Sequence, residues 1–341
     1  MDGPTSWWGE DKWPSAGVSS FAFKKNMESG AGSHRDRKMN SKAVRWTSIN
    51  PHDTRDSPMK LIRFGEPQRE KPGVLLKDGT RLDLSAHIDD YSPDFFAAGG
   101  LARVAELVAS PGNLPVADPS ARLGPPVARP RKFVAIGLNY RRHAAEVGAE
   151  IPKEPEVFTK YTSCICGPND DTLIPKTSTK LDYEVELAFV MGRRAADLPS
   201  EDGALDHVAG YFICNDVSER DFQFRGSQWV RGKSHDTFGP LGPWLVTADE
   251  VGDPHKLEVE TKVNGKTRQK SNTSDFIFNL PHIIWYCSQF FTLEPGDVVT
   301  TGTPEGVAVG MKDPAAFLKE GDVVEVSVDK LGQQTQKVRS K

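Results

Sequence analysis

The chain has 341 residues, with Lys+Arg 43 against Asp+Glu 47 and a formal net charge of -4. That balance leaves no basic surplus to neutralise phosphates, which excludes nucleic acid as a partner. Hydrophobic residues make up 37% of the chain, and no uninterrupted apolar stretch approaches the roughly eighteen residues of a bilayer span, which excludes membrane insertion. The four cysteines are too few for a disulfide scaffold and the N-terminus has no apolar signal region, so we expect a cytoplasmic protein.

The beginning of the chain differs in composition from everything after it. Trp7, Trp8 and Trp13 stand among Gly, Ser, Asp and Lys, and no apolar period of a strand or a helix persists there. We therefore predict that residues 1–58 form a disordered extension. Ordered structure is expected to begin at Met59, which opens directly onto a β-prone run.

Residues 59–125 are predicted to form a small N-terminal α+β domain and a linker. Asp78-Gly79 separates two β-prone runs, as in a hairpin with a tight turn, and the apolar residues from Leu101 to Val108 follow helical spacing. The stretch 115–130 is rich in Pro and small residues and is typical of a linker.

Residues 126–341 are predicted to form the main domain. Short β runs dominate it, with short helices between them and one long apolar helical segment, 277–291, that carries Pro281 near its start, where Pro is tolerated. The strands are too short and too irregularly spaced for a doubly wound parallel sheet. The sequence therefore predicts a mixed α/β, β-rich fold.

Acidic residues alternate with apolar ones in the run from Asp182 to Phe189. If this run is one strand, then Asp182, Glu184 and Glu186 project from the same face and repel one another unless a cation lies between them. Carboxylate ligands of this kind suit Mg²⁺, Mn²⁺ or Ca²⁺ rather than zinc. A solvated strand face would show the same alternation, so both interpretations stay open at this point.

A further acid, Asp216, ends the apolar run 211–215. It is equally typical of a metal ligand and of a helix N-cap. Arg220 and Gln223 follow it three residues apart, so on a helix they would share one face and could contact an anionic ligand together. A surface arginine would have the same spacing.

His143 and Glu146 stand at i and i+3 on a predicted short helix that Asn139 could cap. A carboxylate beside an imidazole fixes its tautomer and raises its basicity, which is how a general base for water is built. The alternative is an exposed His-Glu pair of little consequence.

Two loops combine Gly and Pro with polar side chains. The segment 231–243 carries Lys233, and the segment 300–307 carries Thr303. Each could cradle a carboxylate or a developing oxyanion, and each could also be only a tight turn.

The chain resembles the fumarylacetoacetate hydrolase family through six segments that occur in the family's order: NYRRHAAE, DYEVELAFVMG, FICNDVSERDFQ, RGKSHDTFGPLGPW, KVNGKTRQ and GDVVTTGTPEGV. The resemblance implies a mixed β-sandwich roll that assembles as a homodimer or a dimer of dimers. It also implies one Mg²⁺ or Mn²⁺ held by Glu184, Glu186 and Asp216, a water-activating pair of His143 and Glu146, an enolate-stabilising Lys233, and substrate contacts from Arg220, Gln223 and Thr303.

Within the family, residues 224–247 look most like the bacterial subgroup that cleaves 2,4-diketo-3-deoxy sugar acids such as L-2,4-diketo-3-deoxyrhamnonate. The resemblance implies a small 2-oxo acid substrate whose C3–C4 bond is hydrolysed to pyruvate and a short acid such as lactate. One alternative keeps the fold but changes the reaction to decarboxylation, ureidoglycolate cleavage or enol-keto isomerisation. Another is a non-catalytic, metal-holding binding module, which would have no use for a His-Glu pair.

Overall fold

The computed structural model of the protein describes residues 59–112 and 114–341. The extension predicted for 1–58 lies outside these residues and stays a prediction. Within the described ranges, no helix is long and apolar enough to cross a membrane.

The N-terminal elements match the sequence pattern. The strands are β1 (Lys60–Phe64), β2 (Lys71–Leu75), β3 (Arg81–Asp83) and β4 (Leu123–Gly124), and the helices are α1 (Pro93–Ala97) and α2 (Gly100–Ala109). The predicted hairpin joins β2 to β3, because Gly79 has the left-handed φ of 88° that the turn requires and Asp78 accepts a 2.9 Å hydrogen bond from the Thr80 amide.

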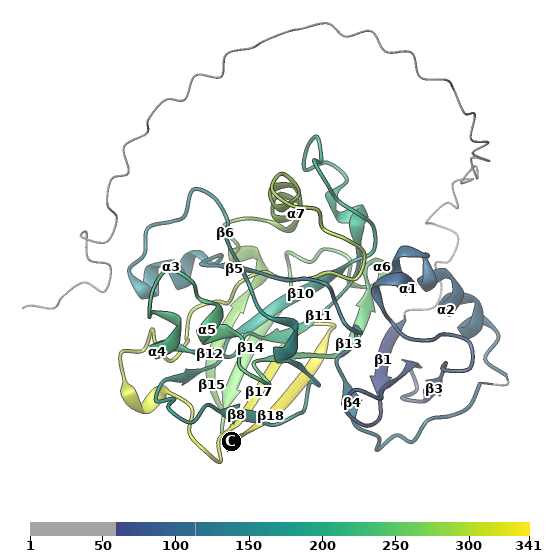
Figure 1. Ribbon diagram of the computed structural model, residues 1–341, viewed down its shortest axis with the longest axis horizontal. Coiled ribbons are helices and arrows are strands. Elements are labelled where there is room, and N and C mark those ends of the chain that lie inside the picture. The colour runs from purple at the N-terminus through teal and green to yellow at the C-terminus, as the bar shows by residue number, and fades with distance from the viewer. Residues whose placement is uncertain (1–58, 113) are drawn as a thin grey trace, which may run out of the picture. The chain divides into compact units, whose positions relative to one another are not determined.

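One large mixed sheet holds most of the buried apolar residues. Its strand order is β3-β2-β1-β13-β11-β10-β16-β5-β6, with β4 beside β1 and β7 beside β13. The strands not yet introduced are β5 (Phe133–Gly137), β6 (Glu156–Thr159), β7 (Ile165–Cys166), β10 (Val185–Met191), β11 (Val208–Asn215), β13 (Gly239–Thr247) and β16 (Val298–Thr300). Every residue of β10 and β11 is buried, and the two strands lie side by side at the centre of Figure 1.

A second sheet has the order β15-β14-β17-β18-β8, and β9 pairs with β12. These strands are β8 (Thr172–Ile174), β9 (Leu181–Asp182), β12 (Ser218–Glu219), β14 (Glu258–Val263), β15 (Lys266–Asn272), β17 (Val323–Val328) and β18 (Gly332–Ser340). In β14 and β17 buried residues alternate with less buried ones, as in a strand with one face on the core.

The helices of this part of the chain are short. They are α3 (Arg141–Val147), α4 (Arg220–Gln223), α5 (Val230–Lys233), α6 (Ala248–Val251) and α7 (Leu280–Ser288), with 3₁₀ turns η1 (Thr162–Cys164), η2 (Ala204–His207), η3 (Thr273–Asp275) and η4 (Pro314–Ala316). The helix predicted over 277–291 is shorter than expected. It begins at Leu280 because Asn279 accepts a 2.9 Å hydrogen bond from the His282 amide and so caps it.

The mixed, β-rich fold predicted from the sequence is confirmed. The division into 59–125 and 126–341 stays a prediction, although β1 is hydrogen-bonded to β13 in antiparallel register, so strands from both segments share one sheet.

We predict that a chain starting at Met59 folds and keeps its activity, because β1 begins at Lys60 and the sequence of 1–58 carries no apolar period of a strand or a helix. The measurement compares the thermal midpoint and kcat/KM of the shortened chain with those of the full chain. A shortened chain that aggregates or loses activity would show that residues 1–58 are needed.

Candidate active site

Three buried carboxylates converge where β10 and β11 lie side by side. Glu184 immediately precedes β10, Glu186 lies within it and Asp216 follows the end of β11. The register pairs Val185 with Asn215, which brings the two acidic segments together. One oxygen from each of the three carboxylates lies within 4.8 Å of the others.

Asp182 does not belong to this group, so the prediction of one strand with three acids on one face is wrong. The run breaks between β9 and β10, because β9 turns away to pair with β12. The Asp182 carboxylate instead accepts hydrogen bonds from the Ala308 amide at 2.8 Å and the Val309 amide at 3.1 Å. It also forms a 2.8 Å ion pair with Arg220.

Three buried cations pair with Glu184 and Asp216. Lys233 Nζ lies 2.7 Å from Glu184 Oε2 and 2.8 Å from Asp216 Oδ2. Arg220 Nη2 lies 2.7 Å from Glu184 Oε1. Lys160, a fully buried lysine at the end of β6, donates to Asp216 Oδ1 and to the backbone carbonyl of Lys233.

These contacts shift the pKa values of Glu184 and Glu186 in opposite directions. Burial by itself raises the pKa of Glu184, but Lys233 and Arg220 outweigh burial and lower that pKa to about 2. Burial, together with the charges of Asp216 and Glu184, raises the pKa of Glu186 well above its usual value. Glu186 is therefore the member of the group that most needs a further cation.

The donor set fits a hard divalent cation. All three ligands are carboxylates, which Mg²⁺ and Mn²⁺ prefer. Each ionised carboxylate offers about four lone-pair sites, so the bonds from Lys160, Arg220 and Lys233 leave acceptor capacity on Glu184 and Asp216. The site can hold one such ion, and the residues do not distinguish between the two metals.

His143 and Glu146 form the predicted pair on α3. His143 Nδ1 lies 3.2 Å from Glu146 Oε2, and the Gly306 amide donates to Glu146 Oε1 at 2.9 Å. The charge on His143 contributes to the lowered pKa of Glu184. An imidazole that donates from Nδ1 to a carboxylate leaves Nε2 free as a base.

Asn139 does not cap α3, and that prediction is wrong. The N-cap position is Tyr140, and the Asn139 amide group donates to the carbonyls of Phe278 at 3.1 Å and Thr301 at 2.8 Å. Asn139 thereby fixes the start of the helix to the loop that follows β16.

The loop that follows β16 connects the pair of His143 and Glu146 to the carboxylates. The Gly302 amide donates to Glu186 Oε2 at 3.0 Å. Thr303 Oγ1 donates to the Val185 carbonyl at 3.0 Å and accepts from Gln269 Nε2 at 2.8 Å. Thr303 therefore holds the loop against β10, and its predicted substrate contact stays a prediction.

The remaining predicted residues lie beside the same group. Arg220 and Gln223 share α4, and Arg220 Nη1 donates to Gln223 Oε1 at 2.9 Å, so they contact each other. The N-cap of α4 is Glu219, which shows that Asp216 is not the cap. Lys233 lies at the end of α5 rather than in a loop. Catalytic or substrate-binding roles for these residues stay predictions.

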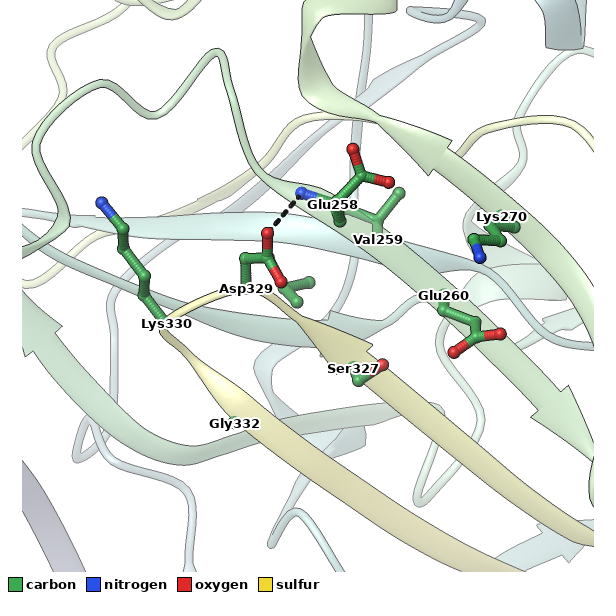
Figure 2. A pocket seen from close by; sticks show the side chains of 9 residues that line it. Glu258, Val259, Glu260, Lys270, Ser327, Asp329, Lys330 and Gly332 are labelled. Atoms are coloured by element: carbon green, nitrogen blue, oxygen red, sulfur yellow. Dashed lines mark hydrogen bonds between the residues drawn. The ribbon is translucent and has the colours of Figure 1, made fainter.

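No sequence pattern indicates Lys160, because a single lysine after a strand resembles a surface residue. The pocket drawn in Figure 2, between β14 and β17, is lined by none of the predicted site residues. The chemistry-bearing groups therefore gather at the carboxylates.

We predict that Lys160→Met lowers the free energy of unfolding by about 3 to 5 kcal/mol, because the Asp216 carboxylate would lose a buried partner. The matched control is Lys71→Met, which removes a lysine 58% exposed and 3.4 Å from Asp83 and should cost less than about 1 kcal/mol. Urea unfolding of both variants makes the comparison, and equal losses would contradict the prediction.

We also predict that binding of Mn²⁺ releases a proton from Glu186. Because its pKa is raised, this carboxyl holds its proton to a higher pH than an ordinary glutamate does, and the carboxylate form is needed to hold a cation, so affinity should rise with pH. Calorimetric titration in buffers of different ionisation enthalpy measures the number of protons released per bound Mn²⁺. The Glu186→Gln variant should release none, and an unchanged count in that variant would contradict the assignment.

Residues 132–339 match the family described as "Fumarylacetoacetate (FAA) hydrolase C-terminal". A Burkholderia multivorans relative, named as a hydrolase with no stated substrate, is 50% identical over 283 residues, which cover 83% of this chain and 99% of that protein.

Two solved structures are similar over 83% of this chain and 99% of their own. One is 5-carboxymethyl-2-hydroxymuconate delta-isomerase from Mycobacterium smegmatis, with 34% identity and a TM-score of 0.65. The other is maleylpyruvate hydrolase from Sphingobium sp. SYK-6 in complex with manganese(II) and pyruvate, with 29% identity and a TM-score of 0.68. With its carboxylate triad and β-rich fold, the chain belongs to the fumarylacetoacetate hydrolase family.

Proposed function

We propose that the protein is a divalent-metal-dependent hydrolase that cleaves the C3–C4 bond of 2,4-dioxo acids of the acylpyruvate type. The observation that carries the proposal is a His-Glu pair linked through the loop after β16 to three buried carboxylates, two of which pair with a lysine. The similarity to a hydrolase solved with manganese and pyruvate supports it, since pyruvate is the product this reaction releases.

Glu184, Glu186 and Asp216 would hold the cation. When bound, a divalent cation supplies Lewis-acid polarisation of the carboxylate and 2-keto oxygens of the substrate. His143, oriented by Glu146, takes a proton from water through Nε2, and the water oxygen adds to the C4 carbonyl carbon.

The tetrahedral adduct then collapses and the C3–C4 bond breaks. Its electron pair goes to C3, which leaves as the enolate of pyruvate. Lys233 provides a positive charge beside the carboxylates, where that enolate develops. The proton held by His143 returns to C3. One water is consumed, with its oxygen on the acyl product and a hydrogen on pyruvate.

A second candidate is isomerisation of a 2-hydroxydienoate, which the similarity to a delta-isomerase favours. It would use the same base to move a proton without water entering the product. Turnover of an acylpyruvate in ¹⁸O-labelled water separates the two. The proposal predicts one ¹⁸O in the acyl-derived acid, and an unlabelled rearranged product would favour the isomerase.

The proposed reaction does not by itself specify the acyl group of the substrate. The preference for a sugar-derived, hydroxylated acyl chain rests on polar residues of 227–236, and it stays a prediction. The Ser234 hydroxyl accepts from the Tyr161 amide at 2.9 Å, Asp236 pairs with Lys341 at 2.8 Å, and the His235 ring packs against Phe238. These side chains make other contacts, so they do not add support for hydroxyl recognition.

We predict that His143→Ala lowers kcat by about 10²–10⁴-fold and leaves Mn²⁺ binding unchanged, because only the water-activating base is removed. The matched control is His282→Ala, since His282 also pairs with a glutamate, Glu201 at 2.8 Å, but lies on α7. Pyruvate release under saturating Mn²⁺ measures both. An undiminished kcat in His143→Ala, or an equal fall in the control, would overturn the assignment.

We further expect a homodimer or a dimer of dimers, as the family resemblance implies. Sedimentation equilibrium of the full chain measures the mass directly. A monomer at micromolar concentration with full activity would contradict this expectation.

A further inference from the structure

A chain of buried side-chain amides runs from the strand β18 to the residue that precedes β10, and the proposed reaction does not use it. Asn215, the last residue of β11, is 1% exposed, and Gln336 on β18 is 0% exposed. Asn215 Nδ2 donates to Gln336 Oε1 at 3.0 Å, and Asn215 Oδ1 accepts from the Glu184 backbone amide at 3.0 Å. Hydrogen bonds therefore join the second sheet to the start of the carboxylate segment.

The partners at the two ends of this chain fix the orientation of both amides. Gln336 Nε2 donates to the backbone carbonyl of Pro168, which can only accept, and to Gln334 Oε1 at 3.1 Å. Gln336 Oε1 must therefore face Asn215 Nδ2. At the other end the Glu184 N–H can only donate, so Asn215 Oδ1 faces it. Reversal of either amide would bring two donors or two acceptors together in a buried place, which costs free energy.

The chain acts on the backbone of two of the three carboxylate residues. Asp216 directly follows Asn215, and the Asp216 amide donates to the Glu184 carbonyl at 2.9 Å. The Glu184 backbone thus donates to the Asn215 side chain and accepts from the next residue along the chain. These two hydrogen bonds fix Glu184 relative to Asp216. Ligands that are already in place need not be ordered when a cation binds, and this preorganisation favours binding.

The two amides do not themselves belong to the carboxylate group. In the described part of the chain, the hydrogen bonds of the Asn215 and Gln336 side chains go to each other, to backbone groups and to Gln334. They can therefore influence a bound cation only through the residues that they hold. Outer partners of this kind orient metal ligands, and their loss weakens metal binding.

Gln334 provides a comparison on the same strand. It is 0% exposed, like Gln336, and its Nε2 donates to the carbonyls of Ile213 at 2.8 Å and Gly242 at 3.1 Å. These bonds also join β18 to the large sheet, but they do not reach the backbone of Glu184. Gln334 therefore shares the burial of Gln336 without its path to the carboxylates.

We propose that Asn215 and Gln336 are positioning residues for the divalent cation, and that β18 thereby sets the affinity of the three carboxylates for it. The inference rests on the proposed metal-dependent function. Gln336 holds the Asn215 side chain, and Asn215 holds the Glu184 backbone. Because coupling between two sites is reciprocal, a bound cation also stabilises β18.

The experiment titrates Mn²⁺ into the full chain and into Gln336→Met, which keeps the length of the side chain and removes both hydrogen-bonding groups. The wild type should bind one Mn²⁺, and Gln336→Met should raise the Kd about 10- to 100-fold. The matched control is Gln334→Met, which leaves Gln336 its bond to the Pro168 carbonyl. It should change the Kd by less than about 3-fold, even where its thermal midpoint falls as far as that of Gln336→Met.

A double-mutant cycle tests whether the two residues act in series. Asn215→Leu should weaken Mn²⁺ binding at least as much as Gln336→Met does, and adding Gln336→Met to it should cause no further loss. Additive losses, an unchanged Kd in Gln336→Met, or equal losses in Gln336→Met and Gln334→Met would overturn the inference. A wild type that binds no Mn²⁺ would overturn the cation site and the metal-dependent function, and the inference with them.

Hydrogen exchange of the wild type gives a readout that does not depend on the folding of any variant. Saturating Mn²⁺ should slow the exchange of backbone amides in β18 and leave β2 and β3, at the far end of the large sheet, unchanged. Slowing that is absent from β18, or equal in all three strands, would contradict the proposal.

Discussion

The structure around the candidate site depends on the ion pairs that stabilise four buried carboxylates. Asp182, Glu184, Glu186 and Asp216 are almost fully excluded from water, and burying an unpaired charge costs several kcal/mol. That cost is offset by three buried cations, Lys160, Arg220 and Lys233. The balance is incomplete by one charge, and the deficit falls on Glu186, whose pKa burial and its acidic neighbours raise. Glu184, Glu186 and Asp216 can hold a cation that would offset this deficit.

The same contacts position the reacting groups. Lys160 ties Asp216 to the backbone of Lys233, so the end of β11 and the end of α5 are held together. The loop after β16 donates to Glu186 through Gly302 and to Glu146 through Gly306, so it links the carboxylates to α3. Hydrogen bonds and ion pairs thus link the His-Glu pair, Lys233 and the three carboxylates, which come from distant parts of the chain.

The sequence predicted the groups whose signal is local. Glu184 and Glu186 stand two apart, and His143 and Glu146 stand three apart, so their proximity follows from strand and helix geometry. The sequence did not predict the contacts that join segments distant along the chain. Asn139 was expected to cap its own helix but bonds to Thr301, and Asp182 was expected beside Glu184 but pairs with Arg220. Lys160 has no periodic or spacing signal, because its contact with Asp216 depends on tertiary packing.

The most direct test of the cation site is a titration of the protein with Mn²⁺ followed by electron paramagnetic resonance. The account predicts one bound Mn²⁺ per chain in the wild type, loss of that ion in Glu184→Gln and Asp216→Asn, and a changed spectrum of the bound ion when pyruvate is added. Binding of one Mn²⁺ that survives both substitutions, or a spectrum that pyruvate leaves unchanged, would contradict it.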